Sequence, residues 1–195
     1  MGLRDILTGR HEVKGPAPDR LFAIATAYIA LESEHQIDPA GSAAIVFQAL
    51  ATAEFEATLR DMEEVVKATG GDSGTRVSTE DDSFGYRWMV LRNPDRAPSV
   101  EDLAVGINAV SSSIETAGHG ERLLCAVFAF VDAQKRRIYF IYNYKRGFWY
   151  PFVPEASTTN TRSTERELQI KAQMDSELPM EPELERWFPL WGIPI

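Results

Sequence analysis

The chain has 195 residues, of which 44% are hydrophobic and 25% charged, and its formal net charge is -9 at pH 7. That length suits one domain around a single core, and the negative charge disfavours general binding to nucleic acid or anionic lipid, because the mean field of the protein repels both. No apolar run reaches the roughly 18 to 20 residues that span a bilayer, and the start of the chain lacks the long apolar stretch of a signal peptide. We therefore expect a cytoplasmic protein without a transmembrane segment.

The first part of the chain is predicted to hold an arm, a helix and a strand. Residues 1–18 end in a segment rich in glycine and proline, and we interpret them as a mobile arm. An apolar stripe over residues 21–31 indicates a core-packing helix, for which Asp19 is a suitable N-cap. A turn is expected at residues 38–41, Asp-Pro-Ala-Gly, followed by a strand at 43–50. A helix over that last segment is the weaker alternative.

The next segments alternate between helical and extended patterns. Thr52 can cap a helix whose apolar residues recur at spacings of three and four. A short strand is expected at residues 75–79, and alternating apolar residues predict a strand at 84–92. Ser99 starts a capping box in which Asp replaces the usual Glu or Gln, and the helix that follows is expected to end at Gly118.

Residues 122–154 carry the most informative pattern, a β-hairpin followed by an aromatic and basic cluster. Nine consecutive apolar residues at 123–131 predict a central strand that is covered on both faces. After a polar turn at 132–135, the return strand at 138–144 alternates between two faces. One face carries Ile138, Phe140, Tyr142 and Tyr144, and the other carries Tyr139, Ile141 and Asn143. Cys125 lies within the first strand, where we expect a buried and unreactive thiol.

The C-terminal stretch is unusually apolar. Residues 184–195 hold seven large apolar side chains, which cannot stay in water without making a patch that drives association. We therefore predict that this tail is extended and packs on the aromatic segment of the hairpin region. The expected contacts join Trp187 or Trp191 to Tyr150 or Phe152.

Together the elements predict a single α+β domain at residues 19–195, in which four or five mainly antiparallel strands are packed by helices. A Ser/Thr-rich loop at residues 155–161 and a mostly polar helix from Ser163 complete the domain. With the helix after Thr52 treated as an insertion, the order of elements resembles the secretion-chaperone-like fold. That resemblance concerns topology and carries no function.

The patterns of reactive residues do not assemble into a catalytic or metal-binding set. The three histidines are widely spaced, and none has a second ligand at helical spacing. The glycine-rich stretch at residues 70–74 lacks a Walker lysine and follows a helix instead of opening one. The serines at 111–113 lie within a helix without a strained elbow. We therefore predict no enzyme activity, no metal site and no cofactor.

The aromatic and basic cluster after the hairpin is the strongest candidate for a binding site. Its members are Tyr142, Tyr144, Lys145, Arg146, Phe148, Trp149 and Tyr150. Cations among aromatic rings could stack a base or hold a phosphate group. The favoured alternative is structural, with an aromatic seam that fixes the tail and cations that lie over rings or pair with carboxylates. Trp187 and Trp191 of the tail are further candidates for contact with a partner.

Five blocks follow one another from Met1 to Pro194: MGLRDILTGR, DSFGYRWMVLR, ERLLCAVFAF, IYNYKRGFWYPF and ELERWFPLWGIP. In this order they resemble the PspA-associated protein PspAB family, and YNYKRG and ERWFPLWG are the most specific parts of the match. That family is associated with actinobacterial phage-shock-type envelope-stress systems built around the membrane-remodelling protein PspA. The resemblance implies this context, and it supplies no catalytic residues.

We therefore expect a non-enzymatic accessory protein that binds a protein partner, PspA or another envelope-stress component, through the arm, the aromatic segment or the tail. The rival hypothesis is a small-ligand or nucleotide-binding enzyme built on Lys145 and Arg146. A concave polar pocket that joins them to neighbouring charges would favour this rival. The neighbouring charges are Arg122 and either Asp132 or Glu121. A third hypothesis is a self-associating protein whose aromatic edge forms a homodimer.

Overall fold

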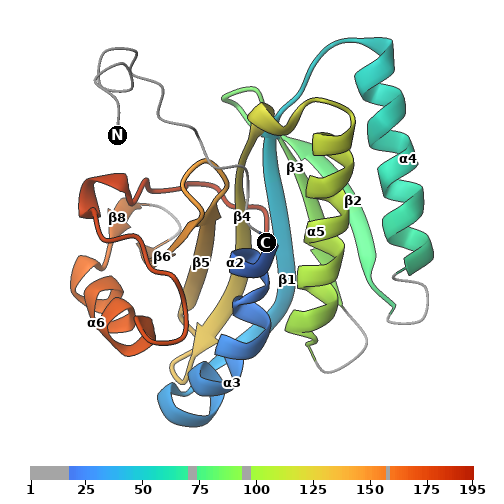
Figure 1. The fold of residues 1–195 in the computed structure, drawn as a ribbon. Coiled ribbons are helices and arrows are strands. Elements are labelled where there is room, and N and C mark those ends of the chain that lie inside the picture. Colours follow the sequence, from blue (N-terminus) through green and yellow to red (C-terminus); the bar gives the residue numbers. More distant parts are fainter. Residues whose placement is uncertain (1–17, 70–73, 94–97, 157–158) are drawn as a thin grey trace, which may run out of the picture.

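Within the described residues, six strands form the central sheet of the protein (Figure 1). The computed structural model describes residues 18–69, 74–93, 98–156 and 159–195. The strands are β1 (Ile37–Gln48), β2 (Arg76–Asp81), β3 (Tyr86–Arg92), β4 (Leu123–Asp132), β5 (Arg137–Asn143) and β6 (Phe148–Phe152). Their spatial order is β2-β3-β1-β4-β5-β6, and every neighbouring pair is antiparallel. A separate ladder pairs β7 (Pro154–Ala156) with β8 (Thr159–Arg162).

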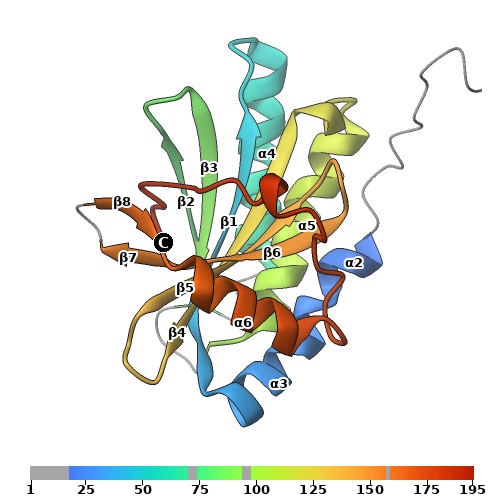
Figure 2. The same cartoon turned by 90° about the vertical axis from the view of Figure 1, so that its left-hand side faces the viewer.

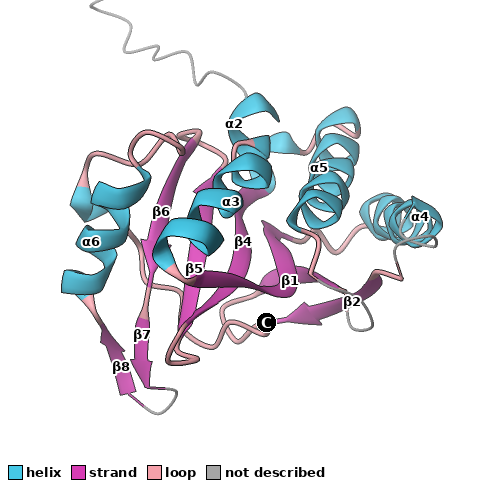
Figure 3. Cartoon of the chain, turned by 90° about the horizontal axis from the view of Figure 1, so that it is seen from below, coloured by secondary structure: helices cyan, strands magenta, loops and turns pink. Residues whose placement is uncertain are grey.

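Helices cover one face of this sheet, and an irregular segment covers the other. The helices are α2 (Pro18–Phe22), α3 (Ile24–His35), α4 (Ala53–Thr69), α5 (Val100–Thr116) and α6 (Thr164–Met174). Figure 3 shows α3, α4 and α5 on the same side of the strands and α6 beyond β6. The chain after α6 crosses the opposite face (Figure 2). Of the predicted arm, residues 1–17 lie outside the described residues, and Pro18 begins α2.

The predicted α+β domain with an antiparallel sheet is confirmed, but the expected number of strands was too low. The missing strand of the sheet is β6, which lies inside the aromatic cluster. Gly147 has φ +69, and the Asn143 side chain accepts hydrogen bonds from the backbone N–H groups of Lys145 and Arg146, so the chain reverses directly after β5. The Ser/Thr-rich loop expected at residues 155–161 is also wrong, because this range contains the end of β7 and most of β8.

The turn predicted at residues 38–41 is wrong as well, since these residues belong to β1. Pro39 pairs with Phe130 of β4, and the register of the two strands shifts before the next pair. Proline has no N–H for the ladder, and Gly41 adopts a φ of +72, so the turn-like sequence produces an irregularity inside a long strand. The first expected helix is divided at Ala23 into α2 and α3.

Two of the three predicted helix caps, Ser99 and Thr52, are confirmed, whereas Asp19 is not a cap because it lies inside α2. The Ser99 hydroxyl accepts a hydrogen bond from the backbone N–H of Asp102 at 3.0 Å, as the capping box predicts, and α5 follows. The Thr52 hydroxyl accepts from the backbone N–H of Phe55 at 3.3 Å and starts α4. Each of these bonds satisfies one backbone donor that the first turn of a helix leaves without a partner.

The sheet buries apolar side chains on both faces, and this produces two cores. The predicted face of β5 with Ile138, Phe140, Tyr142 and Tyr144 belongs to the core under the helices. Tyr139 and Ile141 belong to a second core on the opposite face, together with Val127 of β4. The side-chain alternation predicted for β5 is therefore confirmed, as is the burial of β4 on both faces.

Candidate functional site

Residues 184–195, which we call the strap, cross the second face of the sheet (Figure 2). The strap opens with the 3-10 turn η2 (Leu184–Arg186) and is otherwise without regular structure. Trp187 stacks on Tyr150 of β6, with ring centroids 6.3 Å apart. Trp191 meets the ring of Phe152 edge-on at 5.1 Å. The contacts predicted between the tail and the aromatic segment are thus present.

Hydrogen bonds fix the strap near both of its ends. Arg162 of β8 donates from Nη1 to the Trp187 carbonyl at 2.6 Å. The Tyr139 hydroxyl of β5 donates to the Ile195 carbonyl at 3.0 Å. These bonds tie the strap to β8 and to the central sheet in addition to the apolar contacts, so the strap is part of the folded core and only its outward side chains remain accessible.

Three aromatic residues of the predicted cluster, Tyr142, Tyr144 and Trp149, are buried, each at 4% exposure or less. The indole Nε1 of Trp149 donates to the Arg20 carbonyl at 2.7 Å, which joins β6 to α2. Burial raises the pKa of the Tyr144 phenol. Because these three side chains lie in the core under the helices, they present no face to a ligand or partner. Their burial supports the structural alternative for the cluster.

Arg146 forms ion pairs with two carboxylates of the same chain. Its guanidinium donates to Glu181 at 2.9 Å and to Glu183 at 2.8 Å. These bonds hold the residues that directly precede the strap against the turn after β5. These hydrogen bonds raise the pKa of Arg146 and lower that of the Glu183 carboxyl. The Phe148 ring lies under the Arg20 guanidinium, 5.0 Å from its centroid. Both cluster residues therefore already have partners in the fold.

The rival enzyme hypothesis gains no support from the hollow beside Lys145, whose lining includes none of Arg146, Arg122 and Glu121, and Asp132 lies at the other end of β4. Lys145 follows the end of β5, whose Asn143 pairs with Cys125 near the start of β4, whereas Asp132 ends β4. Because Asp132 lies seven residues beyond Cys125 and a strand rises about 3.3 Å per residue, Asp132 lies roughly 23 Å along the sheet from Asn143, which Lys145 closely follows. The hollow that contains Asp132 and the hollow that contains Lys145 have no lining residue in common.

The hollow beside Lys145 is the clearest candidate for contact with a partner. It has a volume of about 420 Å³ and lies between the strap, the start of β4, the end of β5, and the turn that joins β2 to β3. Its aromatic lining consists of Phe84, Tyr86, Trp88, Tyr150, Phe188 and Trp191, and we call it the aromatic hollow. Three of these rings are well exposed: Phe84 at 77%, Phe188 at 55% and Tyr86 at 38%. Exposed aromatics that gather around one depression are typical of interaction surfaces.

Asp82 holds the exposed rings of the β2–β3 turn in place. Its Oδ1 accepts hydrogen bonds from the backbone N–H groups of Phe84, at 2.8 Å, and Tyr86, at 2.9 Å. Its Oδ2 accepts from the indole Nε1 of Trp88 at 3.0 Å. Gly85 adopts a φ of +83, which completes the tight turn. The outward position of Phe84 is therefore built by the turn and does not depend on a partner.

Reactive groups contribute little to this hollow. Cys125 lines it but is only 8% exposed, and burial raises the pKa of its thiol to about 12, as expected for an unreactive cysteine. In the described part of the chain, no three His, Cys, Asp or Glu side chains gather in a way that could hold a metal ion. None of the described helices combines the length and the apolar character needed to cross a membrane.

A family model described as PspA associated protein B matches residues 1–195, which is the whole chain. The chain belongs to the PspAB family. The family indicated by the sequence blocks is therefore confirmed. Searches of the curated proteins and of the solved structures gave no match, and the likeness of this PspAB chain to the secretion-chaperone-like fold stays a prediction.

Three residues of the PspAB aromatic hollow, Lys145, Tyr150 and Trp191, are candidates on the sequence alone, whereas Phe84 and Phe188 are not. A signal for Phe84 did exist, since a large aromatic residue between Ser83 and Gly85 in a polar turn has no obvious place in a core. For Phe188 no such signal existed. It stands among six other large apolar residues of the strap, and only the three-dimensional fold separates the buried ones from the exposed ones.

Proposed function

We propose that this PspAB protein is a non-enzymatic accessory protein of the cytoplasm that acts by binding another protein of a PspA-type envelope-stress system. PspA itself is the first candidate partner. The description of the family as PspA associated protein B supports this context, and the match extends over the whole chain. The aromatic hollow supports binding to a protein, because its surroundings offer apolar contact area without a set of catalytic groups.

The observation that carries the proposal is the group of exposed rings, Phe84, Tyr86 and Phe188, around one depression. Aromatic anchors of this kind supply most of the binding energy in protein interfaces. At the same rim Lys145 is exposed, and no carboxylate pairs with it among the described residues. We therefore propose that the partner inserts an apolar segment into the hollow and places an acidic side chain close to Lys145.

The test measures the binding of purified PspA to the full-length protein and to two variants, Phe84→Ser and Phe188→Ser. Both residues are exposed, so neither change should disturb the fold. Loss of an anchor ring costs about 2 kcal/mol or more, and we expect affinity to fall about 30-fold or more in each variant. Ile29→Ser on α3 and Val105→Ser on α5 are matched controls, because these side chains are 56% and 52% exposed but lie on the helical side.

Equal losses in all four variants, or none in any of them, would overturn the assignment of the hollow. The absence of any interaction with PspA would move the search to the other components of the system. Light scattering on the same samples tests the third hypothesis, in which the protein forms a homodimer. If the wild-type protein is a dimer that Phe84→Ser dissociates, then the occupant of the hollow is a second copy of this chain.

A further inference from the structure

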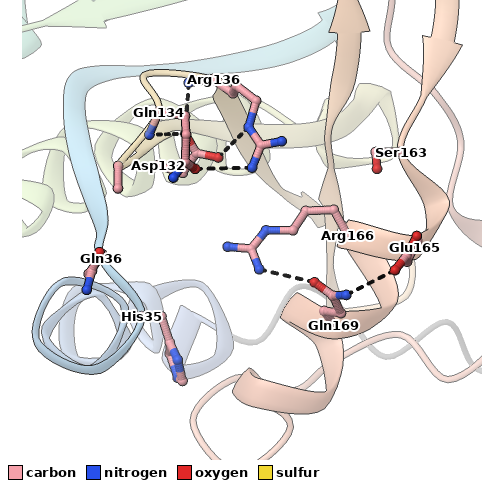
Figure 4. Close-up of a pocket in the computed structure, with 10 residues that line it drawn as sticks. His35, Gln36, Asp132, Gln134, Arg136, Ser163, Glu165, Arg166 and Gln169 are labelled. Atoms are coloured by element: carbon pink, nitrogen blue, oxygen red, sulfur yellow. Dashed lines mark hydrogen bonds and ion pairs between the residues drawn. The ribbon is translucent and has the colours of Figure 1, made fainter.

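A second hollow lies at the opposite end of β4 and is polar (Figure 4). It has a volume of about 420 Å³ and is enclosed by the end of α3, the turn between β4 and β5, and the start of α6. Its principal polar side chains are His35, Gln36, Asp132, Arg136, Arg166 and Gln169. Volumes of this size hold small molecules of metabolite dimensions. None of these side chains takes part in the proposed binding of PspA.

Arg166 is the side chain in this hollow whose hydrogen bonds are incomplete. Its guanidinium reaches from α6 toward the centre of the hollow (Figure 4), where Nη1 donates to the Gln169 amide oxygen at 3.3 Å. Its Nε is buried and has no hydrogen-bond partner. A buried charged donor without an acceptor is costly, and an oxyanion is the acceptor that fits the planar guanidinium best, through two parallel hydrogen bonds.

Two guanidinium groups, of Arg136 and Arg166, and two carboxylates, of Asp132 and Glu165, line the hollow, so the direct pairings decide which charge lacks a partner. Asp132 is neutralised by Arg136, whose Nε donates to Asp132 Oδ2 at 2.7 Å. The Glu165 carboxylate is exposed and accepts a hydrogen bond from the Gln169 amide nitrogen at 3.4 Å. Among the described residues no carboxylate forms an ion pair with Arg166. The Arg166 charge is therefore not compensated by direct contact, and the guanidinium of Arg136 borders the same hollow.

Backbone strain also gathers at this hollow. In the described part of the chain, the residues other than glycine with positive φ are Gln36, at 55°, and Lys135, at 60°. Gln36 lines the hollow, and Lys135 lies in the turn between the lining residues Gln134 and Arg136. Each has a local cause, since Gln36 is the left-handed C-cap of α3 and Lys135 lies in the β4–β5 turn, where its N–H donates to the Asp132 carbonyl, so they shape the walls of the hollow.

We propose that this polar hollow binds a small molecule that bears a carboxylate or phosphate group, with the oxyanion received by Arg166 and supported by Arg136. The ligand supplies the acceptor that Arg166 Nε lacks, and the remaining polar lining receives hydroxyl or amide groups of the ligand. This site is separate from the aromatic hollow, so it can work whether or not the protein binds PspA.

The test titrates the full-length protein by calorimetry with inorganic phosphate and, separately, with malonate, at constant ionic strength. We expect saturable binding of at least one of these anions, and the one that binds identifies the oxyanion class. Arg166→Gln should weaken the binding at least tenfold. Arg60→Gln, an exposed arginine on α4, is the matched control and should bind as the wild type does. Lack of saturable binding of both anions would overturn the proposal.

Thermal unfolding separates a ligand-binding role of Arg166 from a structural one. Without anion, Arg166→Gln should unfold close to the wild type, because the change removes a buried Nε donor that has no partner and loses only the long, exposed hydrogen bond to Gln169. With saturating anion, the wild-type midpoint should rise and that of the variant should not. Arg136→Gln is a second variant on an exposed turn and should also weaken binding. Undiminished binding in both arginine variants would refute the site.

Discussion

At the scale of single residues, Asp132 shows how one carboxylate fixes a turn. Its Oδ1 accepts hydrogen bonds from the backbone N–H groups of Gln134 and Arg136, both at 2.9 Å, and its Oδ2 accepts from the Arg136 guanidinium at 2.7 Å. Burial acts to raise the pKa of Asp132, but these hydrogen bonds outweigh it, and the pKa lies below its ordinary value. The ionised carboxylate is therefore the form that the folded state prefers.

This preference predicts how stability depends on pH. Because the folded pKa of Asp132 is lower than the unfolded value of about 3.9, its contribution is complete above that value and is lost as the pH falls through the folded pKa. Asp132→Asn should lower the free energy of unfolding by about 1 to 3 kcal/mol at pH 7. The difference from the wild type should shrink in urea melts at pH 3 and below. A difference that stays constant from pH 7 to pH 2.5 would contradict the prediction.

At the scale of elements, the strap closes the second core. Trp187 is 5% exposed, whereas its neighbour Phe188 is 55% exposed. Adjacent residues of the strap therefore have different roles, since one fills the second core and the other lines the aromatic hollow. Arg162 connects this segment to α6, since its Nε donates to the buried Glu167 carboxylate at 2.8 Å while its Nη1 donates to the Trp187 carbonyl. The strap is thus held by side chains from several strands and not by a ladder of its own.

Deletion of residues 184–195 should lower the free energy of unfolding by at least about 3 kcal/mol, the scale of one buried tryptophan, and should increase the binding of an apolar dye. Denaturant melts and dye fluorescence measure the two effects. Phe188→Ala is the control, because it removes an exposed ring of the same segment and should leave both quantities near the wild-type values. A truncated protein that is monomeric, equally stable and dye-silent would contradict the role assigned to the strap.

Elements with a strong local signal could be predicted from the sequence, and those that depend on distant partners could not. The two faces of β5 and the cap at Ser99 follow from alternation and from hydrogen bonds within a few residues. The residues around Pro39 look like a turn, and only their pairing with β4 keeps them in a strand. The aromatic cluster was ambiguous for a related reason, since apolar residues on both faces of a strand do not reveal which face is covered.

At the scale of the whole molecule, the two cores share one sheet and should unfold together. Phe128 is 1% exposed in the core under the helices, and Cys125, three residues earlier on β4, belongs to the opposite core. Phe128→Ala should lower the free energy of unfolding by about 3 to 5 kcal/mol through the cavity that it leaves. If the protein unfolds as one cooperative unit, this loss of stability also exposes the Cys125 thiol more often, although the two side chains lie on different faces of the sheet.

The measurement is the rate at which a thiol reagent labels Cys125 in native buffer. In the wild type this rate should be slow, because the thiol is buried and its pKa is about 12. Phe128→Ala should accelerate labelling about a hundredfold or more, since each 1.4 kcal/mol changes the open fraction tenfold. Labelling that remains unchanged while the denaturant midpoint falls would show that the two cores open separately.

The position of the strap along the chain bears on how the protein is made. The face of the sheet with Val46, Val127 and Ile141 finds its cover in residues 184–195, which are synthesised after every strand. Because chains are synthesised from the N-terminus and exposed apolar surface is prone to aggregate, the nascent protein carries an open apolar sheet until translation has passed these residues. Chaperones that recognise apolar segments have their best access to this protein during that interval, and a pause of the ribosome before residue 184 would extend it.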